Sequence, residues 1–316
     1  MTTHSGRIHL GFRTVAARTV RLRRAERLQA YLYLLPAFAL IALWVYWPAV
    51  NTFRLSMFQW NLLATTPKVP VGLNNYRNVV TLPEMGKALR NTAIYILGML
   101  PFSVIFPLAI AFVLNELTGR MRAIYRAIIF VPVLMAPVAV GSIWEWIMAP
   151  IGGVLNRLLH ALFGTGDIYW FQHGSTAIGA IIAITGWKLL GFSVLIYTAG
   201  IAGINREYME AASVDGASRW QTLRAITLPL LSPTILFMLT LSILLSSQWT
   251  FPLINVLTQG GPLDATTNIY YLLYEFGFRN FNIGFSAAAA VLFFIGFGAL
   301  ALCFMWLSDR FSFYDA

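Results

Sequence analysis

The chain has 316 residues, of which 58% are hydrophobic and 11% are charged, and its mean hydropathy is +0.69. Soluble domains carry about 25% charged residues, so this chain lacks the polar surface that such domains need. The composition predicts a polytopic membrane protein. It excludes a DNA-binding domain, because the formal charge of +10 has no soluble face on which to gather. The single cysteine, Cys303, excludes a disulfide framework, and its apolar neighbours predict a buried side chain.

The N-terminal tail, residues 1–28, is strongly basic. It has no acid before Glu26 and holds seven of the 22 basic residues, namely Arg7, Arg13, Arg18, Arg21, Arg23, Arg24 and Arg27. Such a tail is typical of a cytoplasmic segment that touches anionic lipid headgroups. A mitochondrial transit peptide is the competing interpretation, whereas a cleaved secretory signal fits poorly because the following apolar run is too long.

Six apolar segments have the length of about 20 residues that a helix needs to cross the hydrocarbon core. In chain order they lie near residues 30–50, 89–114, 123–148, 176–203, 229–256 and 283–308. They predict an all-α membrane domain over residues 29–308, with a C-terminal tail at 309–316. Between the third and fourth segments, the leucine spacing at 152–164 predicts a short helix at the membrane interface.

Basic residues outside the spans predict the orientation. With the N-terminus in the cytoplasm, 14 basic residues fall on the cytoplasmic side and seven on the outer side, while Lys188 lies within the fourth span. This excess favours a cytoplasmic location for both termini. The loop at 204–228 is then cytoplasmic, and the turn sequence TQGGP at 258–262 is external.

The loop at 204–228 predicts two short helices joined by a turn. Helix formers run from Glu207 to Ala212, and Gly216 can adopt the positive φ that ends the first helix. Pro229 suits the first turn of the helix that follows. A plain connector between two spans would be shorter, so the loop favours a docking surface for another protein. The alternative is a solvated connector that rests on lipid headgroups.

The loop carries E-A-A at 210–212, then Gly216 after three residues, then I-x-L-P at 226–229 after nine more. This spacing resembles the cytoplasmic signature loop of permease subunits in bacterial binding-protein-dependent ABC importers. The segments WKLLGFSVLIYTAGIAGI and VLTQGGPLDATTNIYYLLYEFGF are similar to the carbohydrate and glycerol-3-phosphate branch of that family. The resemblance covers nearly the whole chain and implies the type I importer fold.

The resemblance also implies the partners. It places the chain in the bacterial cytoplasmic membrane with a second homologous permease, two copies of an ABC ATPase and an extracytoplasmic substrate-binding protein, in contact with lipid but not nucleic acid. The loop would dock on the ATPase through Glu210, Ala211, Ala212, Asp215, Gly216 and Arg219. ATP and Mg would be bound by that ATPase, so this chain is expected to carry no cofactor and no catalytic residue. Its only Gly-Lys pair, Gly86-Lys87, lacks the surrounding P-loop pattern.

Polar residues within the spans are candidates for the substrate pathway, because charge in hydrocarbon is costly. Trp187 and Lys188 lie halfway along the fourth span; the alternative for Lys188 is a structural role, bound to carbonyls at a helix break near Gly186 and Gly191. Glu145 either pairs with Lys188 or faces water. The fifth span is the most polar, and Pro252 is expected to loosen its helix. Its candidates are Ser246, Gln248, Trp249 and Asn255, with helix packing as the alternative role.

The expected cargo is a carbohydrate, with glycerol-3-phosphate or a glycerophosphodiester as the alternative within the same importer class. A more distant alternative is an ion-coupled secondary transporter, which would need mid-membrane acids or broken helices arranged as repeats. A membrane enzyme is disfavoured, because the four histidines lack metal-ligand spacing.

Overall fold

The computed structural model describes residues 31–63 and 65–311, with side chains as far as Trp306. Contacts divide the chain into two units, Met1–Leu55 and Ser56–Ala316. In the first unit the described residues form one apolar helix, Tyr31–Leu55, which includes a wider π-helical turn, η1 (Ala42–Tyr46), and α2 (Trp47–Leu55). The predicted N-terminal tail at 1–28 lies outside the described residues. So do residues 312–316 of the predicted C-terminal tail at 309–316, whose first three residues continue helix α15.

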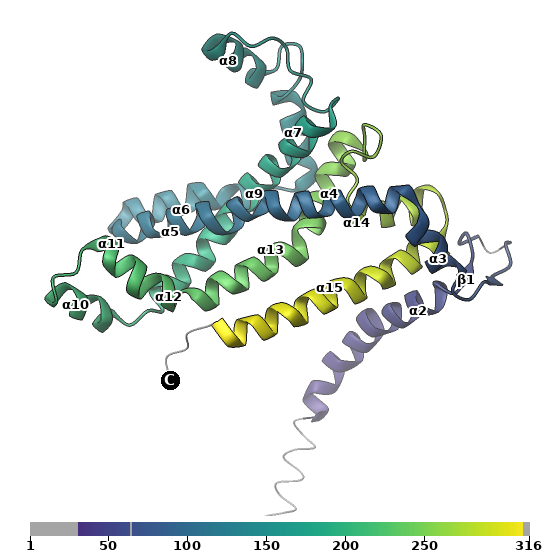
Figure 1. The fold of residues 1–316 in the computed structure, drawn as a ribbon, viewed down its shortest axis with the longest axis horizontal. Coiled ribbons are helices and arrows are strands. Elements are labelled where there is room, and N and C mark those ends of the chain that lie inside the picture. The colour runs from purple at the N-terminus through teal and green to yellow at the C-terminus, as the bar shows by residue number, and fades with distance from the viewer. Residues whose placement is uncertain (1–30, 64, 312–316) are drawn as a thin grey trace, which may run out of the picture. The chain divides into compact units, whose positions relative to one another are not determined.

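The described residues of the second unit form helices and one small hairpin, in which β1 (Phe58–Gln59) pairs antiparallel with β2 (Val69–Pro70). Figure 1 labels most of these elements. The helices are, in chain order, α3 (Asn74–Thr81), α4 (Pro83–Leu100), η2 (Pro101–Ile105), α5 (Phe106–Glu116), α6 (Gly119–Leu134), α7 (Pro137–Ile147), α8 (Val154–Phe163), α9 (Gly174–Ala202), α10 (Arg206–Val214), α11 (Arg219–Thr222), η3 (Leu223–Thr227), α12 (Leu228–Leu230), α13 (Ser232–Leu253), η4 (Ile254–Thr258), α14 (Ile269–Tyr274), η5 (Glu275–Arg279) and α15 (Ile283–Phe311).

Five helical stretches in the described residues are long and apolar enough to cross a membrane, and a sixth span results if α6 and α7 are counted together. Each lies over one of the six predicted segments, and the predicted short helix at 152–164 is α8. The all-α prediction is confirmed.

The third span differs from the prediction of one continuous segment, because its two helices are bent by 98°. Pro132 lies inside α6 and Pro137 begins α7, and neither residue can donate a backbone hydrogen bond. A residue before proline also avoids the helical region, and Ala136 has an extended ψ of 133°. The break therefore follows from the local sequence.

Helix α9 packs against α5, α6 and α13 and so lies at the centre of this bundle. A Cβ added at Gly191 would overlap the carbonyl oxygen of Ile129 and the Cα of Phe130 on α6, and one added at Gly186 would overlap the ring of Phe102. Small residues let helix backbones approach in this way, and packing of this kind holds helices together in lipid.

The sixth span shows which glycines pack and which do not. In α15, Gly284 lies against the backbone of β1 at Phe58, whereas Gly296 and Gly298 face open space. The expectation that Cys303 is buried is wrong: its side chain is exposed on the second half of α15, beside the exposed Leu302. Apolar neighbours in sequence did not predict burial, because a lipid-facing helix surface is equally apolar.

Substitution of Gly191 by alanine is expected to destabilise the bundle. The obstructing atoms belong to the α6 backbone and cannot rotate away, so we expect a loss of about 1–3 kcal/mol in the free energy of unfolding. Gly179→Ala is the matched control, because Gly179 lies on the same helix with open space around it. Thermal denaturation of both variants in one detergent tests this. Equal melting temperatures would contradict the tight α6–α9 contact.

Candidate functional site

The loop at 204–228 folds as the predicted two short helices joined by a turn. Asn205 caps α10 by accepting a hydrogen bond from the backbone N–H of Glu207 at 3.1 Å. Ser218 and Gln221 form a reciprocal capping box at the start of α11. Between them Gly216 has a φ of +73°, a conformation that a Cβ disfavours. Local sequence therefore sets the shape of this loop.

The outer face of α10 carries the acid of the E-A-A sequence. Ala212 is buried, whereas Glu210 is exposed and Val214, one turn further along, is 87% exposed. Trp220 on α11 is 66% exposed and is a residue that sequence reasoning missed. Exposed apolar side chains beside an acid are typical of a protein-binding surface.

A groove of about 500 Å³ lies between α10 and the chain that returns through η3 and α12. Its walls include Ala211, Ala212, Asp215, Ile226 and Pro229. The small alanines of the motif leave this space open. Three of the predicted docking residues, Ala211, Ala212 and Asp215, thus line one groove.

Arg219 makes a contact that sequence reasoning did not foresee. Its Nη1 lies 2.7 Å from Oε2 of Glu116, at the end of α5. Both side chains are largely exposed, and such pairs contribute about 0–1 kcal/mol to stability. The ion pair orients the loop on the second span, so the contact that the structure shows for Arg219 is within this chain.

Lys188 supports the break in the third span. Its Nζ donates a hydrogen bond to the carbonyl oxygen of Val133 at 3.3 Å. In a continuous helix that carbonyl would accept from the N–H of residue 137, which is a proline here. The lysine ammonium therefore replaces the backbone N–H donor that Pro137 lacks.

The expected alternatives for Lys188 can now be separated. A helix break does satisfy it, but the break lies on α6 and not near Gly186 and Gly191 of its own helix. The ion pair with Glu145 is absent from the described residues, and Glu145 is exposed. Trp187 packs edge-on against Trp144 of α7, with ring centroids 5.6 Å apart. The pathway role of Trp187 and Lys188 stays a prediction.

The polar residues of the fifth span do not share one face. Ser246 is fully buried, whereas Gln248, two residues further along α13, is exposed. Trp249 and Asn255 are half-buried. Pro252 does not interrupt α13, and the hydrogen bonding widens only in η4, just beyond it. Its burial favours the packing role for Ser246, and the pathway role of Gln248, Trp249 and Asn255 stays a prediction.

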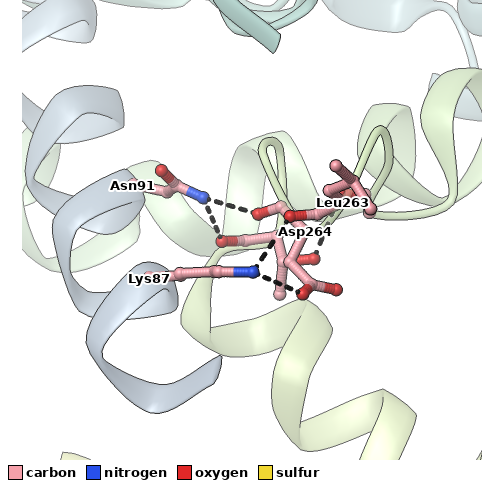
Figure 2. A network of polar contacts seen from close by, with 6 residues as sticks. Lys87, Asn91, Leu263 and Asp264 are labelled. Atoms are coloured by element: carbon pink, nitrogen blue, oxygen red, sulfur yellow. Dashed lines mark hydrogen bonds and ion pairs between the residues drawn. The ribbon is translucent and has the colours of Figure 1, made fainter. Parts of the chain in front are cut away.

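A rigid turn at 259–268 follows the fifth span and is called the outer turn. Figure 2 shows Lys87 and Asn91 of α4 pointing at it. The Nζ of Lys87 lies 3.1 Å from Oδ2 of Asp264 and 3.2 Å from the carbonyl oxygen of Leu263, and Asn91 donates at 2.9 Å to the carbonyls of Asp264 and Thr267. These anchors lie about 175 residues away in sequence, so the turn motif alone did not reveal them.

Buried side chains hold the outer turn from below. The hydroxyl of Tyr95 donates to the carbonyl of Thr266 at 3.0 Å, and Asn268 donates to the carbonyl of Ser247 on α13 at 2.8 Å. Gln259, Gly260, Leu263 and Asp264 have positive φ angles. Leu263 is 90% exposed. The turn thus presents an apolar tip on a fixed backbone.

An acid lies close to the outer turn, on η5. Burial raises the pKa of Glu275, the positive charge of Arg279 opposes this shift, and Asp264 and Glu84 add to it.

In the described residues no group of three His, Cys, Asp or Glu side chains is placed to hold a metal ion.

Residues 83–312 match the model of the binding-protein-dependent transport system inner membrane component. The chain belongs to this family. The predicted resemblance is confirmed, and the chain is a permease component rather than an enzyme.

Curated relatives of this permease match over most of their length. The chain is 32% identical over 305 residues to the probable ABC transporter permease protein YesP of Bacillus subtilis, covering 95% of this chain and 97% of that protein. It is 30% identical to the trehalose/maltose transport system permease protein MalF of Thermococcus litoralis, covering 88% and 92%. It is 29% identical to the sn-glycerol-3-phosphate transport system permease protein UgpA of Agrobacterium fabrum, covering 84% and 90%.

Solved structures share the fold of this permease. A bacterial ABC transporter involved in the import of the acidic polysaccharide alginate matches with a TM-score of 0.78 and 24% identity, covering 92% of this chain and 99% of that one. The structure of a bacterial alginate ABC transporter in complex with an alginate pentasaccharide-bound periplasmic protein matches with a TM-score of 0.80 and 23% identity. These matches confirm the importer permease fold.

We expect Lys188 and Pro137 to be energetically coupled. Lys188→Met leaves the Val133 carbonyl without its charged donor, and hydrogen bonds to charged groups contribute about 1.5–3 kcal/mol. Pro137→Ala returns a backbone N–H at the position that serves Val133 in a continuous helix. The loss of unfolding free energy in the double variant should therefore be smaller than the sum of the losses in the two single variants, by at least about 1 kcal/mol. Denaturation of the four proteins measures the coupling, and additive losses would contradict it.

Proposed function

We propose that this chain is the membrane-spanning permease subunit of an ATP-driven ABC importer and forms half of the pathway for a carbohydrate. An external binding protein delivers the carbohydrate, and the other half of the pathway comes from a second permease. The observation that carries this proposal is the loop at 204–228. It exposes Glu210, Val214 and Trp220 while the Arg219–Glu116 ion pair holds it to the second span.

Coupling follows from that arrangement. The exposed face of α10 docks on an ABC ATPase, one copy for each permease, with Glu210 meeting basic residues of the ATPase. Because α10 is a short capped helix on a fixed turn, it moves as one piece when the ATPase subunits close on ATP. The motion reaches α5 through Arg219–Glu116 and reaches α13 through η3 and α12. ATP and Mg are bound by the ATPase, and this chain needs no cofactor.

At the opposite end, the outer turn receives the binding protein. Leu263 supplies an exposed apolar tip, and Lys87 and Asn91 keep its backbone in one shape. A preorganised turn loses little conformational entropy on binding. The alginate importer has been solved with a periplasmic protein bound, which supports a partner of this kind.

The cargo is a carbohydrate, as for the trehalose/maltose relative. Trp187 is 38% exposed beside Trp144, and indole faces stack on the C–H surface of sugars. The second candidate is glycerol-3-phosphate, favoured by the glycerol-3-phosphate relative and by the ammonium of Lys188 in mid-span. The chain lies in a bacterial inner membrane with both termini in the cytoplasm.

Glu210→Lys is expected to remove the ATPase from the purified permease. Reversal of this charge opposes basic residues of the ATPase and should lower the amount of co-purifying ATPase by about tenfold or more, since tenfold corresponds to about 1.4 kcal/mol. Asp167→Lys is the matched control, because it makes the same charge change on an exposed acid between α8 and α9, away from the loop. Quantitative mass spectrometry of tagged permease from native membranes measures both.

Retention of the ATPase by Glu210→Lys at the level of the parent would contradict the role of the docking loop. A parent chain that purifies with neither an ATPase nor a second permease would favour the alternative function, an ion-coupled transporter.

Arg219→Glu is expected to impair uptake without unfolding the permease, because an exposed ion pair contributes little to stability. Uptake should fall several-fold, since the loop loses its tie to α5. The added change Glu116→Arg restores an opposite pair and should recover uptake. Transport in cells with matched permease abundance measures the three variants. Failure of the reversed pair to recover uptake would assign Arg219 to the ATPase interface instead.

A further inference from the structure

We propose that the end of the bundle beside the loop at 204–228 holds one anionic phospholipid, with its phosphate on Arg122 and Arg126 and its acyl chains in two grooves on either side of α6. The two arginines are four residues apart, so they share one face of α6. This site is independent of the transported substrate.

The two arginines have no acid to pair with in the described residues, whose two ion pairs are Lys87–Asp264 and Arg219–Glu116. Arg126 donates to the hydroxyl of Thr198 at 3.1 Å, and Arg122 donates to the side-chain oxygen of Asn115 at 3.4 Å. The Nε atoms of both are shielded from solvent and have no acceptor among the residues that the structure describes. Two half-buried guanidinium groups with neutral partners favour an anionic acceptor.

An apolar groove of about 280 Å³ runs from Arg126 along the seam between α6 and α9. Thr198 lies at its Arg126 end, and its walls include Ile129, Phe130, Val194 and Leu195. The groove therefore leads from a charged headgroup position toward the middle of the spans. An acyl chain fits this sequence of polar and apolar contacts.

A second apolar groove of about 410 Å³ lies on the other side of Ile129, between α5 and α6. Its walls include Ala109, Ile110, Val113 and Tyr125. It begins at Leu117, near the connection that precedes the arginines, and it also leads toward mid-span. The two grooves share Ile129, three residues after Arg126, which itself lines the first groove. Two adjacent apolar grooves beside this pair of arginines match the shape of a lipid with two chains.

Depth in the membrane agrees with this assignment. Arg126 is seven residues from the start of α6, which corresponds to about 10 Å at 1.5 Å per residue. Arginine side chains at this depth extend to the headgroup region while their stems lie on apolar surface. Basic pockets between spans at the cytoplasmic face suit phospholipid headgroups.

The test uses the purified importer complex, depleted of lipid in detergent and titrated with phosphatidylglycerol, or with phosphatidylcholine of the same chains, under native mass spectrometry. Phosphatidylglycerol should bind in preference, and Arg122→Gln/Arg126→Gln should weaken its binding by about tenfold or more. Arg120→Gln removes one positive charge from an exposed site on α6 that lines neither groove, and it should leave binding unchanged. Ala127→Phe, which fills the first groove and keeps both arginines, should also weaken binding.

Three outcomes would overturn the proposal. Equal binding of the two lipids would show that the arginines do not select an anion. Binding of glycerol 1-phosphate alone as tightly as phosphatidylglycerol would identify a site for a soluble anion, in which the grooves have no part. Loss of the second permease from the double arginine variant would identify this face as a subunit interface. Each result differs from failure of the docking loop, which is measured by loss of the ATPase.

Discussion

The close approach of α9 to α6 at Gly191 is the contact on which the rest of the bundle depends. The backbones of the two helices touch there, so the side chains on either side of Gly191 have fixed neighbours. Lys188, three residues before it, reaches the carbonyl of Val133 at the end of α6. The hydroxyl of Thr198, seven residues after it, accepts a hydrogen bond from Arg126. The close approach at Gly191 thus positions two contacts between α6 and α9. Lys188 bonds to Val133 near the bend of the third span, and Arg126 bonds to Thr198 nearer the start of α6.

Helix α13 connects the two ends at which partners are proposed to bind. With η4 it covers Ser232–Thr258, 27 residues, or about 40 Å at 1.5 Å per residue. It follows the loop at 204–228, and Asn268 of the outer turn donates a hydrogen bond to the carbonyl of Ser247, near the middle of the helix. Five residues earlier along α13, the hydroxyl of Ser103 donates to that of Ser242 at 2.9 Å and joins α13 to η2. Helix α13 is therefore one continuous connection between the loop and the turn.

Sequence reasoning was most accurate where one short-range rule decides the outcome. Hydropathy located all six spans, and capping residues with Gly216 predicted the shape of the docking loop. It failed where the outcome depends on contacts distant in sequence. The Lys188–Val133 bond, the Arg219–Glu116 pair and the anchors of the outer turn join residues at least 55 positions apart. Burial of Cys303 was wrong because lipid-facing and core-facing helix surfaces have the same composition.

The two ends of the bundle share one arrangement of charge. At each end an exposed ion pair lies within the chain, Lys87–Asp264 on the outer turn and Arg219–Glu116 at the docking loop, and an apolar side chain projects beside it. Exposed pairs contribute about 0–1 kcal/mol, so they orient these segments and stabilise the fold little. A transporter that alternates between states needs such contacts, because they define each end and still break at small cost. Stability then comes from the packed core around α9.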